Sequence, residues 1–125
     1  AILLITHDLA VVAEVAERVA VMYAGQVVEC TQTESLFAGP RHPYTKGLLK
    51  SIPRLDEERD RLEIIDGAVP DFRQLPRGCR FHPRCPLATD LCREAAPPLE
   101  ELFSGHQVPD LESAGHFVAC WRADD

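Results

Sequence analysis

The chain has 125 residues, of which 46% are apolar and 26% are charged, a composition typical of one globular domain with a modest core. Its formal charge of −7 argues against nucleic-acid binding, because contact with phosphates requires a basic face. No apolar run reaches the roughly 20 residues of a membrane-spanning helix. The sequence opens with neither a signal peptide nor a normal translation start, so we expect a piece of a longer protein.

The first 52 residues have the periodicities of regular secondary structure. Residues 1–5 (AILLI) form a continuous apolar run, which predicts a strand buried on both faces. The next apolar positions recur every three or four residues, which predicts an amphipathic helix over 9–18. The remaining predicted elements are two strands joined as a hairpin at Gly25 and two helices: 19–24, 26–30, 33–38 and 43–51.

Residues 53–125 have a different composition. Eight of the ten prolines and four of the five cysteines lie there, and hydrophobic periodicity is weak. Such a segment needs a metal or cross-links to hold a shape. We therefore predict two domains, an α/β unit over 1–52 and a small, irregular, Cys-rich unit over 53–125.

A polar trio, Thr6-His7-Asp8, follows the predicted buried strand. Ligands of α/β proteins bind at the carboxyl ends of strands, where His7 would donate to a phosphate oxygen and Asp8 would orient it. The alternative is structural, with Asp8 or Thr6 capping the next helix. Residue types alone favour the structural alternative.

Four cysteines follow the spacing Cys79-x5-Cys85-x6-Cys92-x27-Cys120. Four thiolates suit either zinc or a 4Fe–4S cluster. Zinc sites usually use pairs about two to four residues apart, so the wider spacing points to the larger cluster. Two disulfides, or four reduced structural thiols, stay open as alternatives.

The residues around these cysteines suggest supporting roles. Arginines in this segment are candidates to offset the negative charge of a cluster, and histidines would be substitute ligands if one cysteine did not bind. The arginines are Arg77, Arg80 and Arg84, and the histidines are His82, His106 and His116. Cys30 stands apart from the four and is expected to be a small core residue.

The segment ILLITHDLAVVAEVAERVAVMYAGQVVE resembles the end of the nucleotide-binding domain of ABC transporters. By this resemblance His7 is the switch histidine, which contacts the terminal phosphate of ATP, and Asp8 helps to hold the dimer interface. The phosphate loop, Gln loop, signature sequence and Asp-Glu strand of that family do not occur in this sequence. The resemblance therefore implies that the chain is the C-terminal fragment of a P-loop ATPase, whose cofactor is ATP with Mg²⁺. By itself such a fragment is expected not to bind or hydrolyse ATP efficiently.

Two further segments narrow the resemblance. HPYTKGLLKSIP (42–53) is similar to the hallmark extension of the ATPase subunits of oligopeptide, dipeptide and nickel importers. The tail VPDFRQLPRGCRFHPRCPLATDLCREAAPPLE, with HFVACW after it, resembles the C-terminal region of the same subfamily, and Cys79, Cys85, Cys92 and Cys120 all fall on its pattern. Members of that group carry a 4Fe–4S cluster at these positions.

Taken whole, the resemblance implies an ATP-binding subunit that couples ATP hydrolysis to the import of peptides or nickel. Its expected partners are permease subunits and a second ATPase subunit, and its expected place is the cytoplasmic face of a prokaryotic cell membrane. An alternative of a different class is a free-standing Cys₄ module, binding zinc or an iron–sulfur cluster for a structural or redox-sensing purpose. Nothing in the sequence identifies the transported solute.

Overall fold

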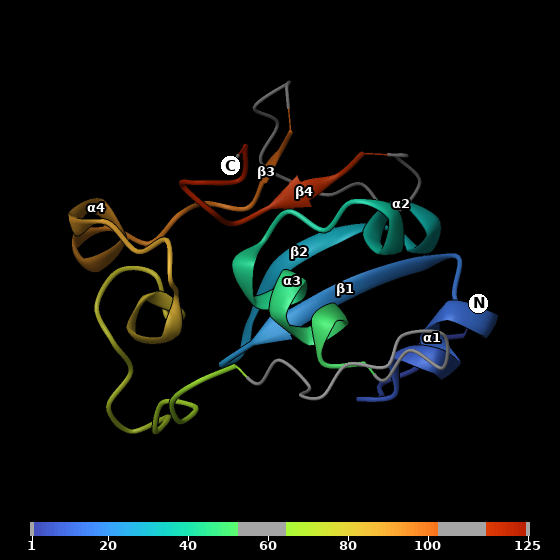
Figure 1. Cartoon of the computed structure of the whole chain (residues 1–125), viewed down its shortest axis with the longest axis horizontal. Coiled ribbons are helices and arrows are strands. Elements are labelled where there is room, and N and C mark those ends of the chain that lie inside the picture. Colours follow the sequence, from blue (N-terminus) through green and yellow to red (C-terminus); the bar gives the residue numbers. More distant parts are fainter. Residues whose placement is uncertain (1, 53–64, 103–114, 125) are drawn as a thin grey trace.

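The computed structural model describes residues 2–52, 65–102 and 115–124, and its regular elements are short (Figure 1). Helices and strands are mixed along the chain, so the described part is a small α/β unit. The elements are α1 (Leu9–Val15), β1 (Arg18–Tyr23), β2 (Gln26–Gln32), α2 (Thr33–Ala38), α3 (Pro43–Lys50), the 3₁₀ helix η1 (His82–Arg84), α4 (Asp90–Glu94), β3 (Glu100–Glu101) and β4 (Phe117–Val118). No helix among the described residues is long and apolar enough to cross a bilayer.

The strands form one antiparallel sheet in the order β1-β2-β4-β3. Strand β4 lies between β2 and β3, with Val118 opposite Glu29 on one side and Glu100 on the other. Residues from both halves of the chain therefore share this sheet. The predicted boundary near residue 53 falls in 53–64, outside the described residues.

The predicted hairpin is confirmed, and its turn explains why it forms. Ala24 and Gly25 both have positive φ, at 46° and 79°, which matches the right-handed twist of the two flanking strands. The register shifts between Val21 and Met22, which indicates a bulge in β1. The predicted helices over 33–38 and 43–51 are also formed, as α2 and α3.

The predicted strand over 1–5 is not formed. Residues 2–6 take no regular structure, and the side chains of Ile2 and Ile5 are 97% and 89% exposed. A strand buried on both faces requires neighbouring strands, and the described residues place none beside this segment. The first helix is also shorter than predicted, ending at Val15, because β1 begins at Arg18.

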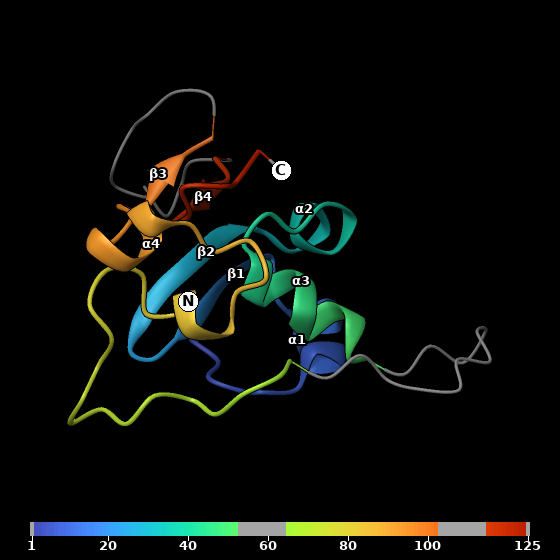
Figure 2. The same ribbon diagram turned by 60° about the vertical axis from the view of Figure 1, so that its left-hand side comes forward.

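The core lies between the hairpin and the helices α2 and α3 (Figures 1 and 2). Phe81, from the second half of the chain, completes it: its ring centroid lies 5.1 Å from that of Tyr23 and 5.5 Å from that of Tyr44. Figure 1 places α4 at the opposite end of the molecule from α1. The second half is thus irregular only in part, since it supplies two strands and a core aromatic residue.

Candidate functional site

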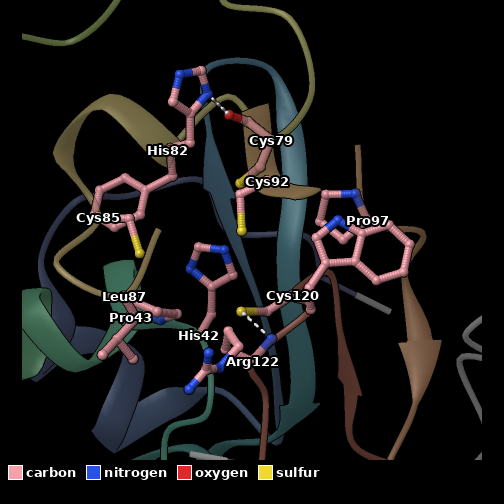
Figure 3. A pocket seen from close by; sticks show the side chains of 12 residues that line it. His42, Pro43, Cys79, His82, Cys85, Leu87, Cys92, Pro97, Cys120 and Arg122 are labelled. Carbon is pink, nitrogen blue, oxygen red and sulfur yellow. Dashed lines mark hydrogen bonds between the residues drawn. The ribbon is translucent and has the colours of Figure 1, made fainter. Parts of the chain in front are cut away.

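Four thiols line one cavity at the α4 end of the structure (Figure 3). They belong to Cys79, Cys85, Cys92 and Cys120. The space among the lining residues measures about 310 Å³, part of it open to solvent. Cys30, which lies in β2, is not among the lining residues. The four cysteines predicted as metal ligands therefore line one cavity, although they come from separate segments, and metal binding by them stays a prediction.

Local backbone structure sets the position of each thiol. Cys79 follows Gly78, whose φ of +68° lets the chain turn toward α4, and the Cys79 amide donates to the carbonyl of Cys92 at 2.8 Å. Cys85 caps the C-terminal end of η1, and Cys92 lies within α4. Cys120 follows β4, and its sulfur accepts from the Arg122 amide at 3.3 Å. One loop, two short helices and a strand end thus meet at one point.

The thiols are reduced, and burial disfavours the thiolate form of Cys79, Cys85 and Cys120. All five cysteines are free, so the two-disulfide alternative is not the state of this structure. Burial raises the pKa of Cys79 and Cys85, and the negative charge of neighbouring thiolates raises both further. For Cys120, burial followed by the same repulsion raises the pKa to about 11. Four thiolates in this space therefore require a cation among them.

The four thiols share one cavity but do not form a site for a single metal ion among the described residues. Among the described residues, no three His, Cys, Asp or Glu side chains are close enough together to hold a single metal ion. The same thiols nevertheless face one cavity (Figure 3).

The candidate arginines have a different role from the one predicted. Arg80 donates through Nη1 to the Ala24 carbonyl at the hairpin turn. Arg84 donates to the carbonyls of Ile65 and Asp66, both at 2.8 Å, and its guanidinium lies over the Tyr23 ring. Arg77 is exposed. Arg80 and Arg84 therefore fasten the cysteine-bearing segment to the hairpin and to residues 65–66 instead of balancing charge at the thiols.

The candidate substitute ligands are also accounted for. His82 lines the cavity, but its Nδ1 is hydrogen-bonded to the Cys79 carbonyl at 2.9 Å. His116 is not a lining residue, and its Nε2 lies 2.6 Å from Oε1 of Glu29. His106 lies outside the described residues.

Sequence reasoning missed His42, which is buried to 1% exposure and lines the cavity. It caps α3, with Nδ1 accepting from the Tyr44 amide, and burial lowers its pKa to about 4. Pro43 after it predicted a helix start, which is correct, but a helix start gives no sign of a distant cavity. Arg122 was missed as well, since it follows the last cysteine without a recognisable motif.

A buried carboxylate, Glu29 in β2, joins the parts that surround the site. Its two oxygens accept from the backbone amides of Arg41 and His42, at 2.8 and 2.9 Å, and from His116. Burial alone raises the pKa of this carboxyl, but these hydrogen bonds together outweigh burial and lower it. Glu29 thereby fixes the loop before α3 and the segment before β4 to the centre of the sheet.

His7 and Asp8 lie away from the thiols. Both side chains are exposed and neither lines the cavity. Oδ1 of Asp8 accepts from the amides of Ala10 and Val11, and Thr6 Oγ1 accepts from the Asp8 amide, so the structural alternative for Asp8 is observed. A contact of His7 with nucleotide remains a prediction.

Fold and site together define a small α/β unit with an antiparallel sheet, a helix capped by the histidine of an Arg-His-Pro-Tyr sequence, and four thiols around one cavity. Residues 28–92 match the family model described as "Oligopeptide/dipeptide transporter, C-terminal region", and the chain belongs to this family. The resemblance stated from the sequence is thus confirmed.

Named relatives agree with this family. The chain is 50% identical over 107 residues to the dipeptide transport ATP-binding protein DppD of Escherichia coli, and 57% identical over 107 residues to the oligopeptide transport ATP-binding protein AppD of Bacillus subtilis. Each alignment covers 86% of this chain and 33% of the relative. The probable peptide ABC transporter ATP-binding protein y4tR of Sinorhizobium fredii is 45% identical across 100% of the chain and 35% of its own length. The chain thus spans about a third of the length of the curated relatives it matches.

Proposed function

We propose that the chain is part of the ATP-binding subunit of a bacterial ABC importer, which couples ATP hydrolysis to uptake of peptides or nickel. The family match over residues 28–92 carries this proposal, and the names of the relatives, all peptide-transport ATP-binding proteins, support it. The proposed partners are the permease subunits and a second ATPase subunit, and the proposed place is the cytoplasmic face of the membrane. The solute stays open among dipeptides, longer peptides and nickel.

Within that subunit we assign the nucleotide contact to His7. Its side chain is exposed, and the Asp8 cap, with two amide hydrogen bonds, holds the backbone beside it at the start of α1. A histidine held in this way can donate to the terminal phosphate of ATP as negative charge develops there. The phosphate loop and the residues that bind Mg²⁺ would come from parts of the subunit that this sequence does not contain.

This assignment predicts a large loss of activity from His7→Ala in the complete ATP-binding subunit assembled with its partners. Loss of one donor to a developing oxyanion lowers kcat by about 100-fold or more. Steady-state phosphate release at saturating ATP measures this effect. Glu14→Ala, an exposed change on the same helix, is the matched control and should leave kcat unchanged. Equal rates for His7→Ala and the parent subunit would remove His7 from the nucleotide site.

We propose in addition that Cys79, Cys85, Cys92 and Cys120 hold a 4Fe–4S cluster. Support comes from the cavity that the four thiols share and from the free state of all of them. When bound, such a cluster supplies a cross-link between four chain segments and a one-electron redox centre. The thiols must lose their protons to bind it, and because the pKa values of Cys79, Cys85 and Cys120 are raised, binding weakens as the pH falls.

Metal analysis of protein purified without oxygen tests the cluster. We expect about four irons and four sulfides per chain, with a broad visible absorption. Cys79→Ser should remove most of the iron, whereas Cys30→Ser makes the same chemical change at a thiol outside the cavity and should retain it. One zinc per chain and no colour would replace the cluster with a structural zinc site, and no metal at all would leave four structural thiols.

A further inference from the structure

The His42 imidazole has one nitrogen in use and one without a partner. Nδ1 accepts a hydrogen bond from the Tyr44 amide at 3.0 Å. A backbone amide only donates, so Nδ1 must carry a lone pair and the ring proton must lie on Nε2. The position of the helix cap therefore fixes the tautomer, and it makes Nε2 a donor.

Nothing in the described part of the chain accepts from this donor. The side chain is 1% exposed, and among the described residues the ring's one hydrogen bond is the bond that Nδ1 accepts from the Tyr44 amide. The ring lines the cavity, and Figure 3 shows it extending from α3 toward the sulfurs of Cys85, Cys92 and Cys120. An N–H that faces a cavity without an acceptor on the described part of the chain marks a place where a bound group can supply one.

The ring is also held firmly in this orientation. The His42 amide donates to Oε2 of Glu29 at 2.9 Å, which anchors the backbone to the sheet. Pro43 restricts the backbone of the residue before it, which is His42, and the Phe81 ring lies 5.7 Å from the imidazole, centroid to centroid. A donor fixed from several sides suits a permanent neighbour better than a transient one.

We propose that Nε2–H of His42 donates a hydrogen bond to a sulfur of the cluster held by the four thiols. This inference rests on the cluster proposed above. Cluster sulfurs accept hydrogen bonds, and a donor stabilises the more negative, reduced form, so it raises the reduction potential. His42 is then a positioning residue that makes two hydrogen bonds through its ring. Nδ1 caps the start of helix α3, and Nε2–H raises the reduction potential of the cluster. These two bonds link the HPY sequence to the cysteine-rich tail.

Two substitutions separate the two nitrogens. His42→Asn keeps a side-chain oxygen that can cap α3, but the side chain is too short to reach the cavity. His42→Gln places an amide N–H near the former Nε2 and loses the cap. The experiment uses the 125-residue chain purified without oxygen, with three readouts: iron content, thermal unfolding midpoint, and reduction potential from a dithionite titration followed by visible absorption and electron paramagnetic resonance.

We expect all three proteins to bind iron. His42→Asn should shift the equilibrium constant for one-electron reduction about tenfold toward the oxidised form, which corresponds to about 59 mV. His42→Gln should restore a potential near that of the parent while unfolding at a lower temperature. A purely structural His42 would give the opposite ranking, with the potential unaffected and only the unfolding midpoint changed.

Three results would overturn the inference. Equal potentials in all three proteins would remove the hydrogen bond and leave the cluster in place. Loss of iron from both variants with secondary structure retained would make His42 a ligand. A parent chain without iron would refute the proposed cluster itself, and the iron measurement on the parent distinguishes this result from the other two.

Discussion

Glu29→Ala should destabilise the folded chain by about 3 kcal/mol or more. The substitution leaves the buried amides of Arg41 and His42 without an acceptor and removes the partner of His116. Each buried group left unpaired costs about 1–3 kcal/mol. Urea unfolding followed by circular dichroism measures the loss of stability. The largest effect expected is a variant that shows no cooperative unfolding transition.

The matched control is Glu34→Ala, which removes an exposed carboxylate from the first turn of α2. Its favourable interaction with the helix dipole is worth only about 0.3–1 kcal/mol, so the change should be small. If Glu29→Ala and Glu34→Ala unfold at the same urea concentration, the Glu29 hydrogen bonds do not stabilise this fold.

The same carboxylate gives the stability a pH dependence. The pKa of Glu29 in the folded chain lies below the ordinary value of 4.5, because its hydrogen bonds outweigh the effect of burial. Its contribution is therefore complete above pH 4.5 and is lost as the pH falls through the folded pKa. Glu29→Gln cannot ionise, so the variant should lack this part of the acid destabilisation.

Gly78→Ala should have a second large effect, on both folding and iron content. An added Cβ would collide with the Cys92 carbonyl oxygen and lie 2.9 Å from the backbone of Arg93, and neither can move without shifting α4. The backbone φ of +68° also disfavours alanine. We expect a loss of about 3 kcal/mol and little bound iron, because the Cys79–Cys92 backbone hydrogen bond positions two of the thiols.

Gly39→Ala provides the comparison. Gly39 caps the end of α2 with a φ of −155°, which alanine adopts readily, and an added Cβ would meet no heavy atom within 4 Å. Its effect should stay within about 0.5 kcal/mol, with iron content unchanged. Normal iron binding by Gly78→Ala would show that the thiols do not depend on this close approach.

Local signals predicted the local elements of this fold. Gly25 marked the hairpin and Pro43 marked the start of α3, and each acts through the backbone angles of its own residue. The apolar run over 1–5 misled because burial depends on neighbouring strands, which a run of apolar residues does not specify. Strands β3 and β4 have two residues each, too few to show an alternating pattern.

The sequence predicted some residues of the candidate site and not others. Spacing and composition identified the four cysteines, since thiols around a metal need little else from the sequence. His42 and Glu29 were not identified, because their roles depend on contacts across the fold: Glu29 meets His116 87 residues further along the chain. A buried carboxylate in a strand and a histidine before a proline have many structural explanations when seen alone.

During synthesis on the ribosome, strand β4 is made long after β2, the strand with which it pairs. A ribosome adds about 5–20 residues per second, so β2 emerges about 4–17 s before its partner strand. During that interval the free edge of β2 has no neighbour from this chain, and Glu29 has no His116. Cys120 emerges later still, so the set of four thiols is complete only after β4 has been made. A message cut short before the codon for Phe117 would yield a product with both an open sheet edge and an incomplete set of thiols.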